Sequence, residues 1–163
     1  MPTQTYTPIA TYTIPSTTST YTFSSIPSTY TDLVLVTSIQ RTATGNTRVR
    51  FNGDTTTNYS TTYIEGNGSA ASSSRNSSQT WMTLDYSNST SNWVPSIAHI
   101  MNYANTTTNK TMINRTGDAG VVVLAYAQLW RKTPEAITSV TLLSDTNFAT
   151  GSTFTLYGIK AGS

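Results

Sequence analysis

The sequence predicts an all-β fold: a single-domain β-sandwich of the jelly-roll type with roughly 8–10 short antiparallel strands. Three observations support this prediction. About a third of the residues are Ser or Thr and only 10% are charged, a composition that favours strands over helices. Several segments alternate apolar and polar residues with a period of two. Turn-forming clusters separate these segments, and no segment has the periodicity of an amphipathic helix.

The 163 residues are expected to fold as one domain with an extended segment in front of it. We predict an N-terminal arm over residues 1–14 and the sandwich over residues 15–163. Within the arm, larger side chains alternate with positions that are mostly threonine. Pro8 places this segment at a sheet edge or on a partner, because proline cannot donate a hydrogen bond to a strand ladder.

The first half of the domain contains three expected strands and one long polar stretch. The strands lie at residues 20–24, 33–36 and 48–51, and the second is apolar throughout, as is typical of a strand buried on both sides. Gly45-Asn46 has the composition of a two-residue hairpin turn before the third strand. We expect residues 55–78 to run along the rim of the fold with one short strand.

The second half ends in the clearest pattern of the chain. Further strands are expected at residues 79–86, 93–103, 110–115, 120–132, 137–144 and 151–160. Between Val121 and Trp130 the odd positions are all apolar and the even positions are apolar or aromatic except for Gln128, so neither side of this strand suits water. We expect the odd positions to lie on the core and the even ones to contact another subunit. The expected oligomer interface is Tyr126, Gln128 and Trp130.

Charge and composition argue against several classes of function. The net charge is +2 and the nine Lys and Arg residues are scattered, so no basic patch predicts nucleic-acid binding. There is no cysteine, and therefore no disulfide framework or thiolate metal site. No apolar run is long enough to predict a membrane span, and the first residues do not have the pattern of a secretory signal. We expect synthesis in the cytoplasm.

The residues capable of catalysis do not form a recognisable set. His99 is the only histidine, and we interpret it as a structural residue with a hydrogen-bond partner. The seven carboxylates lie mostly in or beside turns, where they satisfy backbone donors. Asn52-Gly53-Asp54 is interpreted as a turn, with a calcium site as the alternative. We therefore expect no enzyme, cofactor or metal.

Among the possible binding residues, the aromatic ones are the most informative. Trp and Tyr concentrate at subunit interfaces and also stack on sugars. Trp81 and Trp93 are the candidates for glycan binding, which is the alternative to a purely structural role.

Four segments, at residues 23–35, 50–54, 59–69 and 147–160, resemble a family of small structural proteins of tailed bacteriophages. The most specific of them is the closing motif Phe-x-x-Gly-Ser-x-Phe-x-Leu-Tyr-Gly-Ile-Lys, which ends at Lys160. The resemblance covers most of the chain from Phe23 onward. It implies a virion component with a β-sandwich fold.

The resemblance leaves two places on the particle open. About twenty residues precede the first of these segments, too few for a fibre shaft, so we expect a capsid cement (decoration) protein on the outside of the shell. Its expected partners are the major capsid protein and further copies of itself, as a homotrimer, with a dimer left open. The arm residues expected to bind the capsid are Tyr6, Pro8, Ile9, Tyr12 and Ile14. The alternative is a tail-fibre or receptor-binding tip that recognises host surface glycans.

Overall fold

The computed structural model describes residues 5–87, 90–119 and 121–160 of the chain. Within these residues it is all-β: it contains twelve strands and no helix, and so no helix able to cross a membrane. The strands are β1 (Tyr6–Thr13), β2 (Thr18–Phe23), β3 (Asp32–Ile39), β4 (Gly45–Phe51), β5 (Tyr59–Gly66), β6 (Ala71–Gln79), β7 (Met82–Ser87), β8 (Val94–Met101), β9 (Lys110–Asp118), β10 (Val122–Trp130), β11 (Val140–Phe148) and β12 (Thr153–Ile159).

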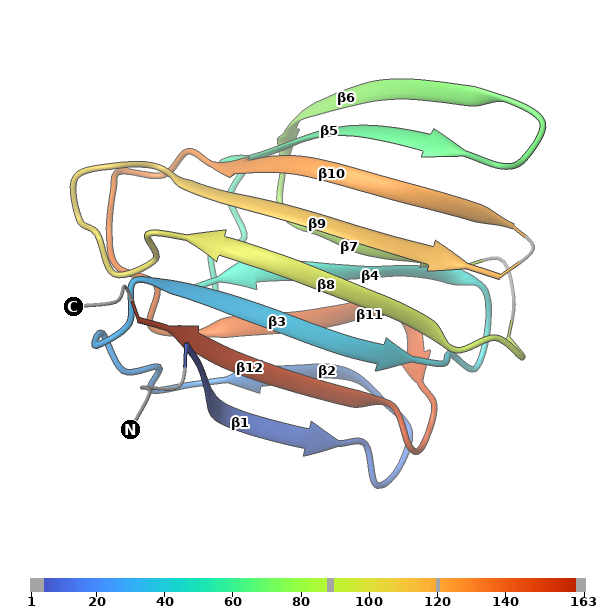
Figure 1. The fold of residues 1–163 in the computed structure, drawn as a ribbon, viewed down its shortest axis with the longest axis horizontal. Helices are drawn as coiled ribbons and strands as arrows, with labels where there is room; N and C mark the ends of the chain where they lie inside the picture. Colours follow the sequence, from blue (N-terminus) through green and yellow to red (C-terminus); the bar gives the residue numbers. More distant parts are fainter. Residues whose placement is uncertain (1–4, 88–89, 120, 161–163) are drawn as a thin grey trace.

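The strands form two antiparallel sheets of unequal size. The large sheet has eight strands in the order β1-β12-β3-β8-β9-β10-β5-β6, and the small sheet has four in the order β2-β11-β4-β7. Figure 1 looks onto the large sheet with the small sheet behind it. The chain crosses repeatedly from one sheet to the other, for example along β2, β3, β4 and β5, as in a jelly roll. The predicted single-domain β-sandwich is therefore confirmed, with twelve strands in the described residues where roughly 8–10 were expected.

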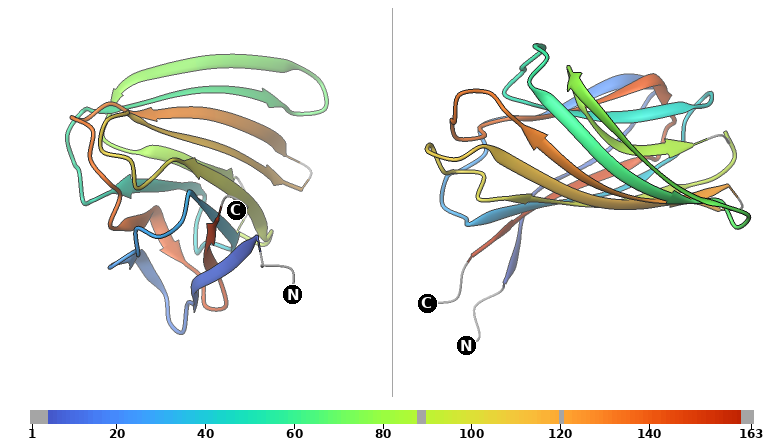
Figure 2. Two further views of the ribbon diagram at one scale, coloured as in Figure 1. Left: turned by 60° about the vertical axis from the view of Figure 1, so that its left-hand side comes forward. Right: turned by 90° about the horizontal axis from the view of Figure 1, so that it is seen from above.

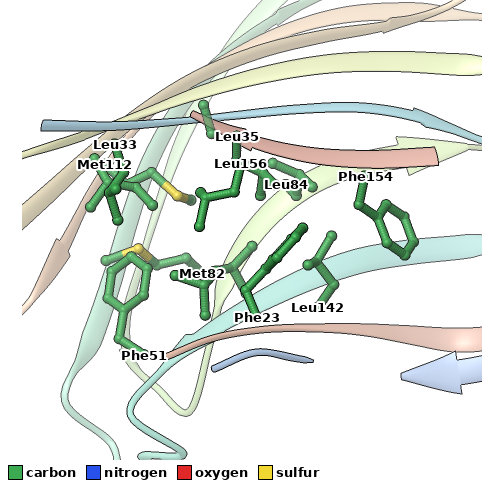
Figure 3. Close-up of a cluster of buried hydrophobic side chains, with 14 of the residues drawn as sticks. Phe23, Leu33, Leu35, Phe51, Met82, Leu84, Met112, Leu142, Phe154 and Leu156 are labelled. Atoms are coloured by element: carbon green, nitrogen blue, oxygen red, sulfur yellow. The ribbon is translucent and has the colours of Figure 1, made fainter. Parts of the chain in front are cut away.

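The hydrophobic core lies between the sheets. Alternate residues of each strand point inward because the side-chain period of a strand is two. Figure 3 shows side chains from both sheets meeting in the core, among them Phe23 and Leu142 of the small sheet and Leu35 and Leu156 of the large one. Burying each such side chain contributes roughly 1.5–3 kcal/mol. The core thus holds together sheets that share no backbone ladder.

The closing motif has a packing role that the structure explains. Gly158 of β12 lies against the ring of Tyr30, and a methyl group at this position would overlap that ring. Tyr30 precedes β3, the strand that pairs with β12. Two of the segments that carry the family resemblance are therefore in direct contact.

The N-terminal arm predicted over residues 1–14 is, from Tyr6 to Thr13, a strand of the domain itself. β1 pairs antiparallel with β12 at the edge of the large sheet, with a bulge between Pro8 and Ala10. The edge position predicted from Pro8 is confirmed. The separate arm is wrong over this range, because the alternating side chains that suggested an arm add a strand to the chain's own sheet. Ile14 is buried in the core, and residues 1–4 lie outside the described residues.

Two details of the middle of the chain also differ from expectation. Gly45 and Asn46 belong to β4, which pairs with β7 and β11 in the small sheet and makes no hairpin with β3. The preceding residues cross between sheets, and there Arg41 forms a buried ion pair with Asp85 of β7. Burial lowers the pKa of Arg41 to about 10. The 55–78 stretch lies at the rim as predicted, but it forms two strands, β5 and β6.

Candidate functional site

The three residues predicted to contact another subunit are buried inside the fold. Tyr126, Gln128 and Trp130 are 5%, 1% and 2% exposed, so their assignment to an oligomer interface is wrong. The odd positions of β10 face outward instead, beginning with Val123. As predicted, neither face of this strand is typical of a solvated surface. The even positions, however, lie on the core, and the odd positions, which were expected there, face outward.

Hydrogen bonds explain why the even face is the buried one. The Trp130 Nε1–H donates to Asp54 Oδ2 at 2.6 Å, and its ring packs beside Phe51 and Tyr59. A large ring with a polar group needs a buried space with a partner inside it. The interior of the sandwich supplies both, and the flat outer surface supplies neither.

Gln128 joins the two sheets through its side-chain amide. Its Oε1 accepts the backbone N–H of Thr83 at 2.7 Å, and its Nε2 donates to the Thr83 carbonyl at 2.8 Å. The same amide also bonds to Thr61 and Asn114. Because β7 is the edge of the small sheet, this amide takes the place of a neighbouring strand. Gln128 had been assigned to a subunit interface, whereas its hydrogen-bonding capacity is satisfied inside the fold.

Asn52-Gly53-Asp54 forms a tight turn, as predicted. Asn52 and Gly53 both have positive φ, and the Asp54 N–H donates to the Phe51 carbonyl at 2.9 Å. Burial alone would raise the pKa of Asp54, but hydrogen bonds from Thr56, Trp130 and Asn58 lower it to about 2. In the described part of the chain no group of three His, Asp or Glu side chains is placed to hold a metal ion.

The remaining acidic residues and the histidine are also engaged in local contacts. His99 Nε2 lies 2.8 Å from Asp32 Oδ2, so the predicted hydrogen-bond partner exists. Each of the other carboxylates accepts a hydrogen bond or forms an ion pair. These contacts fix turns and strand edges and bring no pair of carboxylates together around His99.

The outer face of the large sheet, the side turned away from the small sheet, is unusually apolar. We define it by Val36, Ile64, Ile97, Ile113, Arg115, Val123, Ala125, Ala127 and Leu129. Cross-strand pairing places these residues in adjacent rows, for example Val36–Ile97–Arg115–Ala125–Ile64. Val123 is 67% exposed, Ile64 62% and Ile113 50%. A contiguous apolar surface of this kind marks a contact with another molecule.

Arg115 lies at the centre of the outer face. It borders three shallow hollows of about 790, 450 and 390 Å³ that together span the strands from β3 to β6. Among the described residues its guanidinium has neither a hydrogen-bond nor an ion-pair partner. A cation surrounded by aliphatic side chains favours a partner that brings a carboxylate to it.

A second concave region lies at the other side of the large sheet. The β5–β6 hairpin extends past β7, the edge of the small sheet, which the left view of Figure 2 shows. Beneath the hairpin is a cleft of about 470 Å³, which we call the hairpin cleft. Its lining comprises Asn46, Arg48, Thr61, Tyr63, Glu65, Asn76, Gln79, Trp81, Thr83, Leu124, Tyr126 and Tyr86.

The two tryptophans predicted to bind glycans do not share a site. Trp81 lines the hairpin cleft, whereas Trp93 borders a separate hollow of about 600 Å³ near Gly68 and Ala119. The hairpin cleft instead combines Trp81 with tyrosines of β5 and β10, two strands far apart in sequence. The alternation of apolar and polar residues along the sequence does not predict this grouping of aromatic side chains, because the grouping depends on which strands lie side by side in the fold.

The outer face was also missed by the sequence analysis. One signal for it is present in β9. Ile113 and Arg115 lie on one side of this strand, and Met112 and Asn114 lie on the other. This alternation indicates an outward side that carries an aliphatic residue and a cation. In comparisons with protein-family models, curated proteins and solved structures, nothing matches this chain. Its function is therefore inferred from its own geometry and from the family resemblance.

Proposed function

We propose that this chain is a bacteriophage capsid cement protein that binds the outside of the major capsid shell through the outer face of its large sheet. The observation that carries the proposal is the exposure of aliphatic side chains across neighbouring strands, with Val123, Ile64 and Ile113 at least half exposed. Covering such a surface contributes roughly 25 cal/mol per Å² of apolar area removed from water. The role is structural and involves no catalysis.

The charge of the outer face favours a different protein over a second copy as its occupant. Arg115 needs a carboxylate opposite it, and Arg75 lies on the same face at the end of the row through Ile113. The carboxylate on this face, Asp32, is already held by His99. A self-paired face would bring like charges together, whereas an acidic shell surface would complement them.

Self-association is a separate part of the proposal. The expected homotrimer stays a prediction, and no interface is assigned to it, because Tyr126, Gln128 and Trp130 are internal. In the proposed assembly, shell contacts exist only between folded partners, so binding stabilises the shell by mass action.

Imaging of intact particles at a resolution that traces the chain tests the proposal. We expect density for the chain on the capsid surface, with the outer face of the large sheet turned toward the shell. Particles stripped of the protein are expected to release their DNA at a lower temperature. Density at the tail tip would instead favour the receptor-binding alternative, and unchanged DNA release would contradict a cementing role.

A further inference from the structure

The hairpin cleft has the size of a small-ligand site. Its volume of about 470 Å³ falls within the range of ligand pockets, roughly 300–1,000 Å³. Four aromatic side chains line it, and most of the remaining lining groups are amides and hydroxyls. Apolar rings surrounded by neutral hydrogen-bonding groups match the two kinds of surface on a sugar ring, its C–H face and its hydroxyl rim.

The floor of the cleft contains a nearly buried polar group without a partner. Tyr126 is 5% exposed, and no hydrogen bond to its hydroxyl is formed by the described residues. Tyr63 lies beside it, with ring centroids 5.6 Å apart. Burial raises the pKa of Tyr126, with a further contribution from Tyr63, so the hydroxyl remains a donor at neutral pH. Buried hydroxyls normally have a hydrogen-bond partner, and a ligand in the cleft would provide one for the Tyr126 hydroxyl.

Trp81, which lines the cleft, is held in place by a neighbouring guanidinium. The guanidinium of Arg48 lies 3.9 Å from the centroid of its ring, and Arg48 is itself fixed by an ion pair with Asp145 at 2.7 Å. A ring that is already oriented loses little conformational freedom when it stacks on a ligand. The Trp81 platform is therefore preorganised.

Charge narrows the class of ligand. Arg48 is neutralised by Asp145, and Glu65 brings a negative charge to the lining, so the site has no free cation for an acidic sugar. Glu65 is also the one carboxylate among the described lining residues, whereas most glycosidases use a pair. The cleft is thus suited to binding a neutral sugar and not to cleaving it.

We infer that the hairpin cleft is a binding site for a short neutral oligosaccharide, which stacks on Trp81 and receives hydrogen bonds from Tyr126 and Tyr63. Asn76 of β6 faces the cleft opposite Thr61 and supplies an amide from the hairpin side. The site does not include Trp93. It is independent of where the protein sits on a particle and does not rest on shell binding.

Immobilised glycans provide the first test, with the whole chain as the probe. The array carries neutral cello-, malto-, manno- and chito-oligosaccharides, together with sialylated and sulphated glycans for comparison. We expect binding to at least one neutral series and none to the anionic glycans. Absence of binding to every neutral series, or binding to the anionic glycans alone, would overturn the inference.

Variants then locate the site by calorimetric titration with the neutral oligosaccharide that binds best. Trp81→Ala should weaken binding about tenfold or more, while Trp93→Ala, the matched control, should leave it unchanged. Tyr126→Phe keeps the ring and should weaken binding roughly threefold to tenfold by removing one hydrogen bond. The Phe variant decides the question if Trp81→Ala unfolds. Equal affinity of Tyr126→Phe and wild type, or equal losses at Trp81 and Trp93, would contradict the assignment.

Discussion

The two faces of β10 are both largely apolar, yet only one of them is buried by the chain's own fold. The inner face carries Tyr126, Gln128 and Trp130, whose polar atoms face the interior or the cleft at its edge. The outer face carries small and medium aliphatic side chains, of which Val123 and Leu129 are the largest. The difference teaches that size and hydrogen-bonding capacity, more than hydrophobicity, decided which face turned inward. The outer face then remains apolar without any role in the monomer's core.

The largest expected effect comes from truncating the inner face. Trp130→Ala removes a buried ring and leaves Asp54 without one donor, so we expect a loss of about 3–5 kcal/mol in the free energy of unfolding. Leu129→Ala, the neighbouring position on the outer face, should cost less than about 1 kcal/mol. Denaturant unfolding of both variants measures the contrast, and equal losses would show that the faces are not distinguished as described.

A second variant tests hydrogen bonding separately from size. Gln128→Leu keeps a similar volume but leaves the backbone of Thr83 unpaired at the edge of the small sheet. Buried unsatisfied groups cost about 1–3 kcal/mol each, so we expect a loss of about 2–3 kcal/mol by denaturant unfolding. Ala127→Leu on the outer face is the control and should be nearly neutral. A neutral Gln128→Leu would mean that the amide does not bridge the sheets.

The inner face of β12 shows the opposite requirement at Gly158. Here the Tyr30 ring occupies the space that a side chain would need. Gly158→Ala introduces a methyl group against the Tyr30 ring and should cost about 1–3 kcal/mol. Thermal unfolding of Gly158→Ala, Tyr30→Ala and the double variant measures the coupling between the two positions. We expect the double variant to be more stable than the sum of the single losses predicts, and strict additivity would argue against direct contact.

The smallest expected effect is a pH dependence located at Asp54, which anchors Trp130. Its pKa in the folded protein is about 2, below the ordinary value of 3.8. The ionised carboxylate therefore stabilises the fold above about pH 4, and this contribution is lost as the pH falls toward 2. Unfolding measured across this range should show that Asp54→Asn lessens the acid-induced loss of stability. Thr57→Asn, at an exposed position that leaves every carboxylate in place, should retain that loss, and identical pH profiles for wild type and Asp54→Asn would count against the assignment.

The sequence was sufficient for the fold class and for the positions of most strands, because both depend on local alternation and turn composition. The turn at Asn52-Gly53 followed from residues that tolerate positive φ, and the edge position of Pro8 followed from the missing N–H of proline. The partners of each strand were not accessible in this way. Gly45-Asn46 resembled a hairpin turn, yet β3 and β4 lie in different sheets, where the buried Arg41–Asp85 pair accompanies the crossing.

The candidate surfaces were predicted less well for a related reason. In β10 the alternation gave two faces that both avoid water, and Tyr126 and Trp130 were assigned to a subunit interface, where such aromatic residues are common. Only the long-range bonds from Gln128 to Thr83 decide the matter, and they join strands far apart in sequence. Likewise Trp81, a predicted candidate for glycan binding, lines a concave aromatic cleft, but its neighbours Tyr63 and Tyr126 come from strands that sequence order does not place together.

Binding of the purified protein to particles that lack it tests the central claim most directly. The claim is that the outer face of the large sheet docks on the capsid shell. Arg115→Glu and Val123→Glu should keep the wild-type unfolding temperature but fail to sediment with the particles. Arg115→Lys, which preserves the charge, and Thr57→Glu, in an exposed turn, should bind nearly as well as wild type. Full binding by the two outer-face Glu variants would contradict the claim.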